Sequence, residues 1–146
     1  IGIGGLGSWW AGVLADRYGR TRVAGGAMVV SGSCAALTPI VFGAPVWLIV
    51  PFVLVWGITI VADSAQFSTM VTETARDETR GTALTLQTAA GFPLTRVTIR
   101  GVPAIADAAG WRWAFPVLAV GPALGVWAMV RLARSPYASQ LAGGRG

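Results

Sequence analysis

The sequence predicts an all-α membrane protein, a polytopic bundle of about five transmembrane helices. Hydrophobic residues make up 54% of the chain and charged residues 12%, and the mean hydropathy is +0.64, which is too apolar for a water-facing surface. No charged side chain occurs between Val23 and Ala62. As a helix this stretch would be ~60 Å long, twice the ~30 Å hydrocarbon core of a bilayer, so it must hold two spans. Gly43-Ala44-Pro45 predicts the turn between them.

Five spans can be placed along the chain as a single helical domain. They cover about residues 1–15, 22–42, 46–70, 82–106 and 113–132, and residues 133–146 form a polar tail. Uncharged stretches this long favour helices over barrel strands, which alternate polar and apolar residues over ~10 positions. Glycines in the first span allow close helix packing in lipid. Because the chain opens inside a span, without Met or a signal peptide, we expect a fragment of a longer protein.

The arginines predict how the spans are oriented. Eight of the eleven basic residues follow the first, third or fifth span, and one, Arg112, lies in the opposite connections. The eight are Arg17, Arg20, Arg22, Arg76, Arg80, Arg131, Arg134 and Arg145. By the positive-inside rule these three segments, including the C-terminal tail, are cytoplasmic. The mixed-charge connection from Glu73 to Arg80 is interpreted as a solvated turn.

Composition argues against several function classes. The chain has no histidine and one cysteine, Cys34, so the commonest metal ligand and general base are absent. No metal cluster, phosphate-binding loop or nucleophile–base pair is visible, and we expect no enzymatic activity, metal or cofactor. The basic excess lies between apolar spans, where topology rather than nucleic acid explains it.

The stretch GVLADRYGRTR, residues 12–22, joins the first two spans through about seven residues, so these helices should be antiparallel neighbours. Topology alone explains Arg17, Arg20 and Arg22 but not Asp16 or Gly19. Gly12 and Gly19 suit a chain reversal, and Gly19 can adopt a positive φ. Asp16 is an acceptor for exposed N–H groups at a helix end. The alternatives are arginines that only set topology and a latch between helices.

This stretch resembles the cytoplasmic-loop signature of the major facilitator superfamily of transporters. The matching residues are Gly12, Leu14, Asp16, Arg17, Gly19, Arg20 and Arg22. GWRWAF at Gly110–Phe115 resembles the lead-in to the last helix of a six-helix half. VADSAQFSTMVTE followed by RGTALTLQTAAGF is similar to the tenth and eleventh helices of a bacterial branch. The resemblance covers nearly the whole chain.

The resemblance implies two six-helix halves, of which this chain would be the C-terminal one, helices eight to twelve, because no apolar segment follows the fifth span. The signature also occurs after the second helix, so the N-terminal half stays an alternative. In the family this loop packs against a helix of the other half. We therefore expect that Asp16 has no partner in this chain.

Asp63 is the candidate for substrate or proton coupling. It lies ~24 Å from the outer end of the third span, where burying a carboxylate costs ~2.5 kcal/mol or more. If this span is the tenth helix, the resemblance places it along the central cavity, with Ser64 and Gln66 as further polar contacts. The alternative is a structural bond from Asp63 to a neighbouring helix end.

Arg96 and Arg100 share one face of the fourth span at i and i+4. Arg100 can extend to the interface, whereas Arg96 lies deeper and ~10 Å or more from Asp63. In sequences of the family that this chain resembles, both positions are usually apolar. Arg96 is therefore either an anion-handling cavity residue or an unselected change.

Two functions follow from these expectations. The first is a secondary active transporter of small solutes in a bacterial inner membrane, working by alternating access with the missing N-terminal half, with protons as a candidate coupling ion. The second is a non-transporting remnant or helix-packing module.

Overall fold

The computed structural model of the protein describes residues 2–144, and the side chains within that range except those at 2–4, 6 and 142. Arg145, one of the arginines counted above, lies outside the described residues. Helices account for nearly all of the described chain, and no strand occurs in it. The elements, in order, are α1 (Gly2–Tyr18), α2 (Arg20–Val41), α3 (Val46–Thr74), η1 (Asp77–Thr79), α4 (Arg80–Ala109), α5 (Trp111–Ala114), η2 (Pro116–Ala119), α6 (Val120–Ala133) and η3 (Pro136–Gly143).

Three of these helical segments are long and apolar enough to cross a membrane. They are α2, α3 and the continuous segment Trp111–Ala133, with mean hydropathies of 1.5, 2.2 and 1.7. Apolar side chains on α3 are largely exposed, as expected for a surface that faces lipid: Val46, Trp47, Leu48, Val50, Val53, Leu54, Val55, Ile60 and Val61. The all-helical fold is thus confirmed, and three helices able to cross a membrane support a membrane protein. The helices α1 and α4 do not belong to this group of three.

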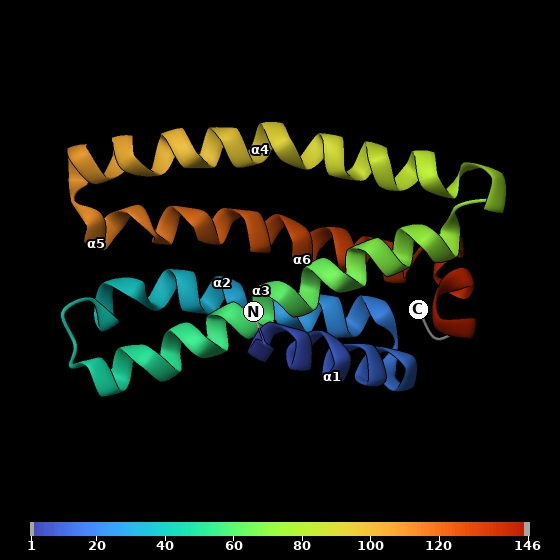
Figure 1. The fold of residues 1–146 in the computed structure, drawn as a ribbon, viewed down its shortest axis with the longest axis horizontal. Helices are drawn as coiled ribbons and strands as arrows, with labels where there is room; N and C mark the ends of the chain where they lie inside the picture. Colours follow the sequence, from blue (N-terminus) through green and yellow to red (C-terminus); the bar gives the residue numbers. More distant parts are fainter. Residues whose placement is uncertain (1, 145–146) are drawn as a thin grey trace.

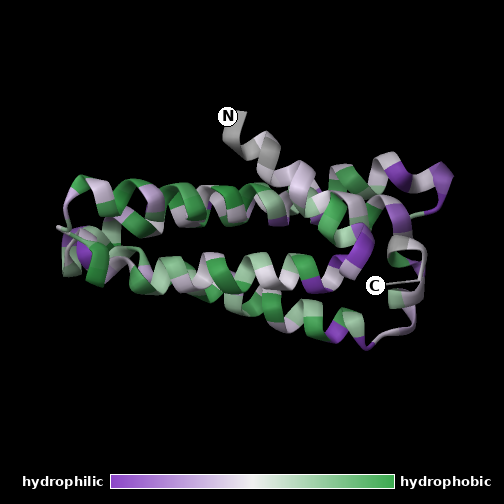
Figure 2. Cartoon of the chain, turned by 90° about the horizontal axis from the view of Figure 1, so that it is seen from below, coloured by the Kyte–Doolittle hydropathy of each residue, from purple (hydrophilic) through white to green (hydrophobic). Residues whose placement is uncertain are grey.

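The helices run lengthwise side by side, so that their connections gather at two ends (Figure 1). The α1–α2 junction, η1 and η3 lie at one end, and the α2–α3 turn and α5 lie at the other. The first end, called here the arginine-rich end, carries most of the hydrophilic residues (Figure 2). The three arginine-bearing segments therefore share one end of the molecule, as the alternation of charges predicted.

The connection between α1 and α2 differs from the prediction. We expected about seven loop residues, but α1 continues to Tyr18 and α2 begins at Arg20, so Gly19 alone separates them. Gly19 has φ 99°, a conformation that side chains with a Cβ rarely adopt. The side chains of Asp16, Arg17 and Tyr18 are exposed, so extending α1 through these residues buries no charge. Gly12 lies inside α1 with open space around it, so its expected part in the chain reversal is wrong.

The predicted turn between α2 and α3 is confirmed. The chain leaves the helix after Val41 and re-enters it at Val46, with Gly43 at φ 86°. Pro45 precedes the first turn of α3, where its missing N–H leaves no helical hydrogen bond unmade.

Glycine sets the closest helix contacts, as predicted for α1. A Cβ on Gly7 would lie 2.8 Å from Cγ2 of Ile58 in α3, and one on Gly125 of α6 would lie 2.5 Å from Sδ of Met28 in α2. The hydrophobic core lies beside these contacts, towards the arginine-rich end. Its buried residues are Ala24, Met28, Met70, Met129 and Leu141.

The segment after α6 was expected to be a polar tail. It folds as η3, in which Leu141 is fully buried and belongs to the same core as Met70 of α3. The C-terminal segment is therefore packed against the bundle up to this point.

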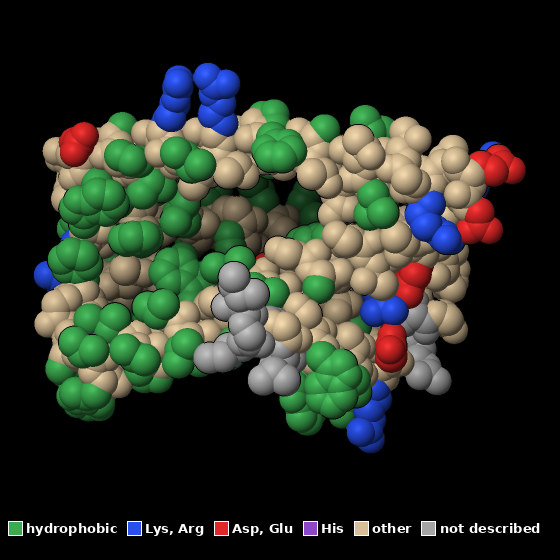
Figure 3. All heavy atoms as spheres, in the orientation of Figure 1, with side chains coloured by type: hydrophobic (Ala, Val, Ile, Leu, Met, Phe, Trp, Pro, Cys, Tyr) green, Lys and Arg blue, Asp and Glu red, His purple; other side chains and the backbone are tan. Residues whose placement is uncertain are grey.

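Helix α4 stands apart from the rest. It is one continuous helix despite Pro93 and Pro103, and Ala106 is its one buried residue. A space-filling view shows a hollow between α4 and the other helices, with basic side chains projecting from the outer edge (Figure 3). Its large apolar side chains are 65–70% exposed at Leu86, Phe92, Leu94, Val97 and Ile99.

Candidate functional site

The side chain of Arg20 is the centre of a polar cluster at the arginine-rich end. Its Nη2 lies 3.0 Å from Oδ1 of Asp16 and 2.7 Å from Oε1 of Glu73. Its Nε donates to the same Glu73 oxygen at 2.7 Å, and Nη1 donates to Oε1 of Gln66 at 3.3 Å. We call Asp16, Arg20, Gln66 and Glu73 the Arg20 cluster.

Three helices position these four side chains. Asp16 lies in the last turn of α1 and Arg20 is the first residue of α2, so the single-residue break at Gly19 keeps them within ion-pair distance. Gln66 and Glu73 are seven residues apart on α3, which places them two turns apart on one face. The cluster therefore ties the α1–α2 junction to α3.

Burial makes these contacts energetically important. The side chain of Arg20 is 11% exposed and that of Glu73 is 24% exposed, whereas that of Asp16 is 67% exposed. A charged hydrogen bond shielded from water contributes ~1.5–3 kcal/mol, and an exposed ion pair ~1 kcal/mol or less. Glu73 is thus the main partner of Arg20, and Asp16 is the weaker one.

The expectation that Asp16 has no partner in this chain is wrong. The family resemblance assigned its partner to a helix of the other half, but α1 continues far enough to bring Asp16 one helical turn from Arg20. The other basic residues of the signature lie outside the cluster. The guanidinium of Arg17 lies 5.6 Å from the ring centre of Tyr18, and Arg22 is exposed.

Glu73 was missed as a site residue because it was assigned to a solvated turn. It belongs instead to the last two turns of α3. The signal was present in its spacing from Gln66, since two polar residues seven positions apart in a helix share a face. The sequence did not reveal that this face meets α2.

The proposed cavity residues do not form one site. Ser64 donates to Oδ1 of Asp63 at 3.2 Å and to the carbonyl of Ile60 at 2.9 Å. Gln66 is buried in the Arg20 cluster instead. Arg96 is exposed on α4, and within the part of the chain that the structure describes its guanidinium makes no hydrogen bond or ion pair. Asp63 and Ser64 remain a polar pair within an apolar helix.

No protein family model, no curated protein and no solved structure matches the chain. Among residues 2–144, no group of three or more His, Cys, Asp or Glu side chains could hold a metal ion. The helices and the Arg20 cluster are therefore the features that bear on function.

Proposed function

We propose that the chain is the C-terminal helical half of a secondary active transporter of small solutes, built like those of the major facilitator superfamily. In this proposal α1, α2, α3, α4 and the segment from α5 to α6 are the five spans. The protein lies in a bacterial inner membrane with the arginine-rich end in the cytoplasm. An N-terminal half would complete the alternating-access pathway.

The observation that carries the proposal is the Arg20 cluster. Topology requires basic residues at this end, but it does not require a buried arginine held by a carboxylate and an amide from another helix. Contacts of this kind are discrete, because they are either made or broken, so they can favour one conformation of a two-state protein. We therefore assign the cluster the role of a latch that stabilises one transport state.

The substrate site is assigned to the central part of α3 and the hollow beneath α4. Asp63 lies near the middle of α3, where an ionisable residue in a span is a functional candidate by default. In this proposal Asp63 couples solute movement to protons, and the exposed Arg96 of α4 has no assigned role.

Transport can be tested directly. The protein expressed from its complete gene would be reconstituted in liposomes with an internal pH dye, and sugars, amino acids and hydrophobic cations would be supplied one by one. We expect at least one of these solutes to accumulate above the level in protein-free liposomes. Absence of uptake across the panel, with folded protein in the vesicles, would favour a non-transporting module.

Proton coupling is tested by Asp63→Asn in the same vesicles. Removing the titratable group should leave solute exchange in place and abolish uptake driven by a pH gradient. Ser64→Ala is the matched control, because it alters the neighbouring side chain without removing the carboxylate. An unchanged pH dependence in Asp63→Asn excludes Asp63 as the coupling group.

A further inference from the structure

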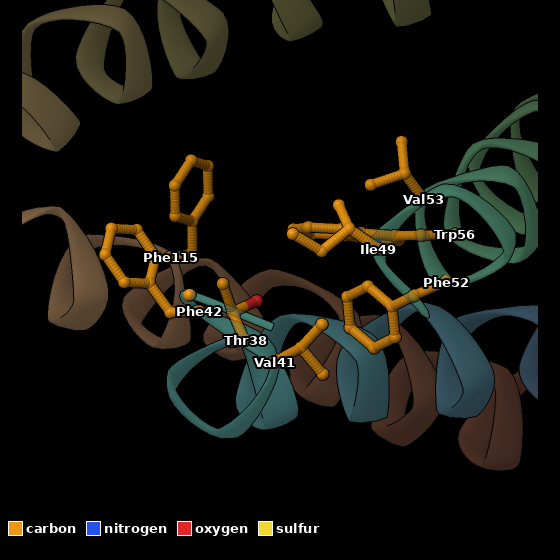
Figure 4. A pocket seen from close by; sticks show the side chains of 9 residues that line it. Thr38, Val41, Phe42, Ile49, Phe52, Val53, Trp56 and Phe115 are labelled. Carbon is orange, nitrogen blue, oxygen red and sulfur yellow. The ribbon is translucent and has the colours of Figure 1, made fainter. Parts of the chain in front are cut away.

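An apolar cavity of about 300 Å³ lies at the end opposite the Arg20 cluster (Figure 4). Its wall comes from the end of α2, the α2–α3 turn, the first turns of α3 and one residue after α5. The principal lining side chains are those of Thr38, Phe42, Ile49, Phe52, Trp56 and Phe115. This volume is at the lower end of the range for ligand pockets.

The polar groups of the wall already have partners. The hydroxyl of Thr38 donates to the carbonyl of Cys34 at 3.1 Å, and Nε1 of Trp56 donates to Oγ of Ser31 at 3.2 Å. A polar ligand would therefore lose its hydration without gaining hydrogen bonds here. The cavity suits a flexible hydrocarbon chain.

Aromatic rings connect this cavity to the end of the bundle. The ring centres of Trp111 and Phe115 are 6.3 Å apart, those of Phe115 and Trp56 are 6.2 Å apart, and those of Trp56 and Phe52 are 6.2 Å apart. Trp111 and Trp113 are 53% and 57% exposed, and tryptophans at span ends prefer the headgroup level of a bilayer. The cavity thus extends inward from that level.

Arg112 lies between these two tryptophans in the sequence and bonds to Pro39, the residue next to Thr38 of the cavity wall. Its Nε donates to the carbonyl of Pro39 at 2.8 Å, and Pro39 directly precedes the last two residues of α2. This bond satisfies a carbonyl at a helix C-terminus and holds the guanidinium in place. Within residues 2–144 its two Nη groups make no hydrogen bond or ion pair, so they can bind another acceptor.

We propose that this end of the bundle binds an anionic phospholipid, with one acyl chain in the cavity and the phosphate on the Nη groups of Arg112. A guanidinium is well suited to two phosphate oxygens. Towards this end, α4 carries two charged residues, Arg100 and Asp107. Together with Arg112 they give a net charge of +1. That excess favours a headgroup with net negative charge.

Lipid retention tests the headgroup contact. The protein would be held in nanodiscs with equal phosphatidylglycerol and phosphatidylcholine, transferred to detergent, and weighed by native mass spectrometry. We expect retained phosphatidylglycerol on the unmodified protein and roughly tenfold weaker retention in Arg112→Gln. Arg134→Gln, which removes the same charge at the arginine-rich end, should retain the lipid.

The acyl-chain contact is tested independently, because Arg112→Gln also removes a bond to α2. Val53→Trp fills the cavity from a half-exposed position on α3, and Val50→Trp makes the same change outside the lining residues. Of these two variants, we expect Val53→Trp to lose the lipid and Val50→Trp to retain it. Excess inorganic phosphate should not displace the lipid from the unmodified protein. The proposal is overturned if the unmodified protein retains no phosphatidylglycerol, if Val53→Trp retains it fully, or if phosphate displaces it.

Discussion

Arg20 is a cation removed from water, so its donors must be satisfied by the protein. Glu73 supplies the one well-shielded carboxylate, and it accepts from both Nε and Nη2. Asp16 is mostly exposed and Gln66 is neutral, so neither can replace that negative charge. The free energy of the cluster therefore depends mainly on Glu73.

Replacing Glu73 by Gln should lower the free energy of unfolding by about 1–3 kcal/mol, because Arg20 stays buried without its main counter-charge. Thermal unfolding in detergent, followed by circular dichroism, measures the change. Asp77→Asn is the matched control, since Asp77 pairs with Arg80 and its side chain is 89% exposed. Equal stability of the two variants would mean that the Arg20 cluster adds nothing to the fold.

The sequence marked three of the four cluster residues as candidates, but not as one cluster. Asp16 and Arg20 belong to the loop signature, with Asp16 expected to have no partner, and Gln66 was expected to line a cavity with Asp63. Glu73 was assigned to a turn because charge density alone does not mark where a helix ends. The pairing of Arg20 with α3 depends on how α2 and α3 cross, which no local pattern encodes.

At the scale of elements, glycine decides how closely the helices pack. The α2–α6 contact places Gly125 against Met28, and a Cβ there would lie 2.5 Å from its sulfur. Gly26 of α2 has open space around its Cα. Both glycines lie inside a helix, and they differ in packing.

Gly125→Val should destabilise the protein relative to Gly26→Val by about 1–3 kcal/mol, because the added methyl groups must displace a core side chain. The change in helix propensity is the same at both positions and cancels in this comparison. Parallel thermal unfolding of the two variants measures the difference. A Gly26→Val variant that is the less stable of the two would refute this packing of α6 on α2.

Helix positions were predictable because membrane spans are set by the length of apolar stretches. The α2–α3 turn was found from glycine and proline, but the α1–α2 junction was placed too broadly. Charged residues there were taken for a loop, although they continue the helix beyond the apolar region. The packing of Leu141 was also missed, since a single apolar residue in a Gly-rich tail carries no periodic signal.

For the molecule as a whole, the arrangement of the ends predicts its topology. Cysteines at Ala44 and Ala108, at the arginine-poor end, should react with a membrane-impermeant maleimide added outside intact cells. Cysteines at Thr79 and Ala138 should react only after the membrane is opened, because excess arginine stays on the cytoplasmic side. A Cys34→Ala background removes the one native thiol.

External labelling at Thr79 in intact cells would show that the arginine-rich end faces outward, opposite to the predicted orientation. Labelling of Ala44 and Ala108 from opposite sides would show that the number of spans differs from five. In that case α4 or one of its neighbours does not cross the membrane. The cavity at the arginine-poor end would then no longer lie at a headgroup level.

The latch role of the Arg20 cluster in transport is tested most directly by uptake in liposomes. The protein from the complete gene would be compared with Glu73→Gln and Asp77→Asn at equal amounts of folded protein, with a solute that the panel identifies. We expect uptake by the unmodified protein and by Asp77→Asn, and a loss of roughly tenfold or more in Glu73→Gln, because one transport state loses its stabilising contact. Full uptake by Glu73→Gln, or none by the unmodified protein, would contradict this account.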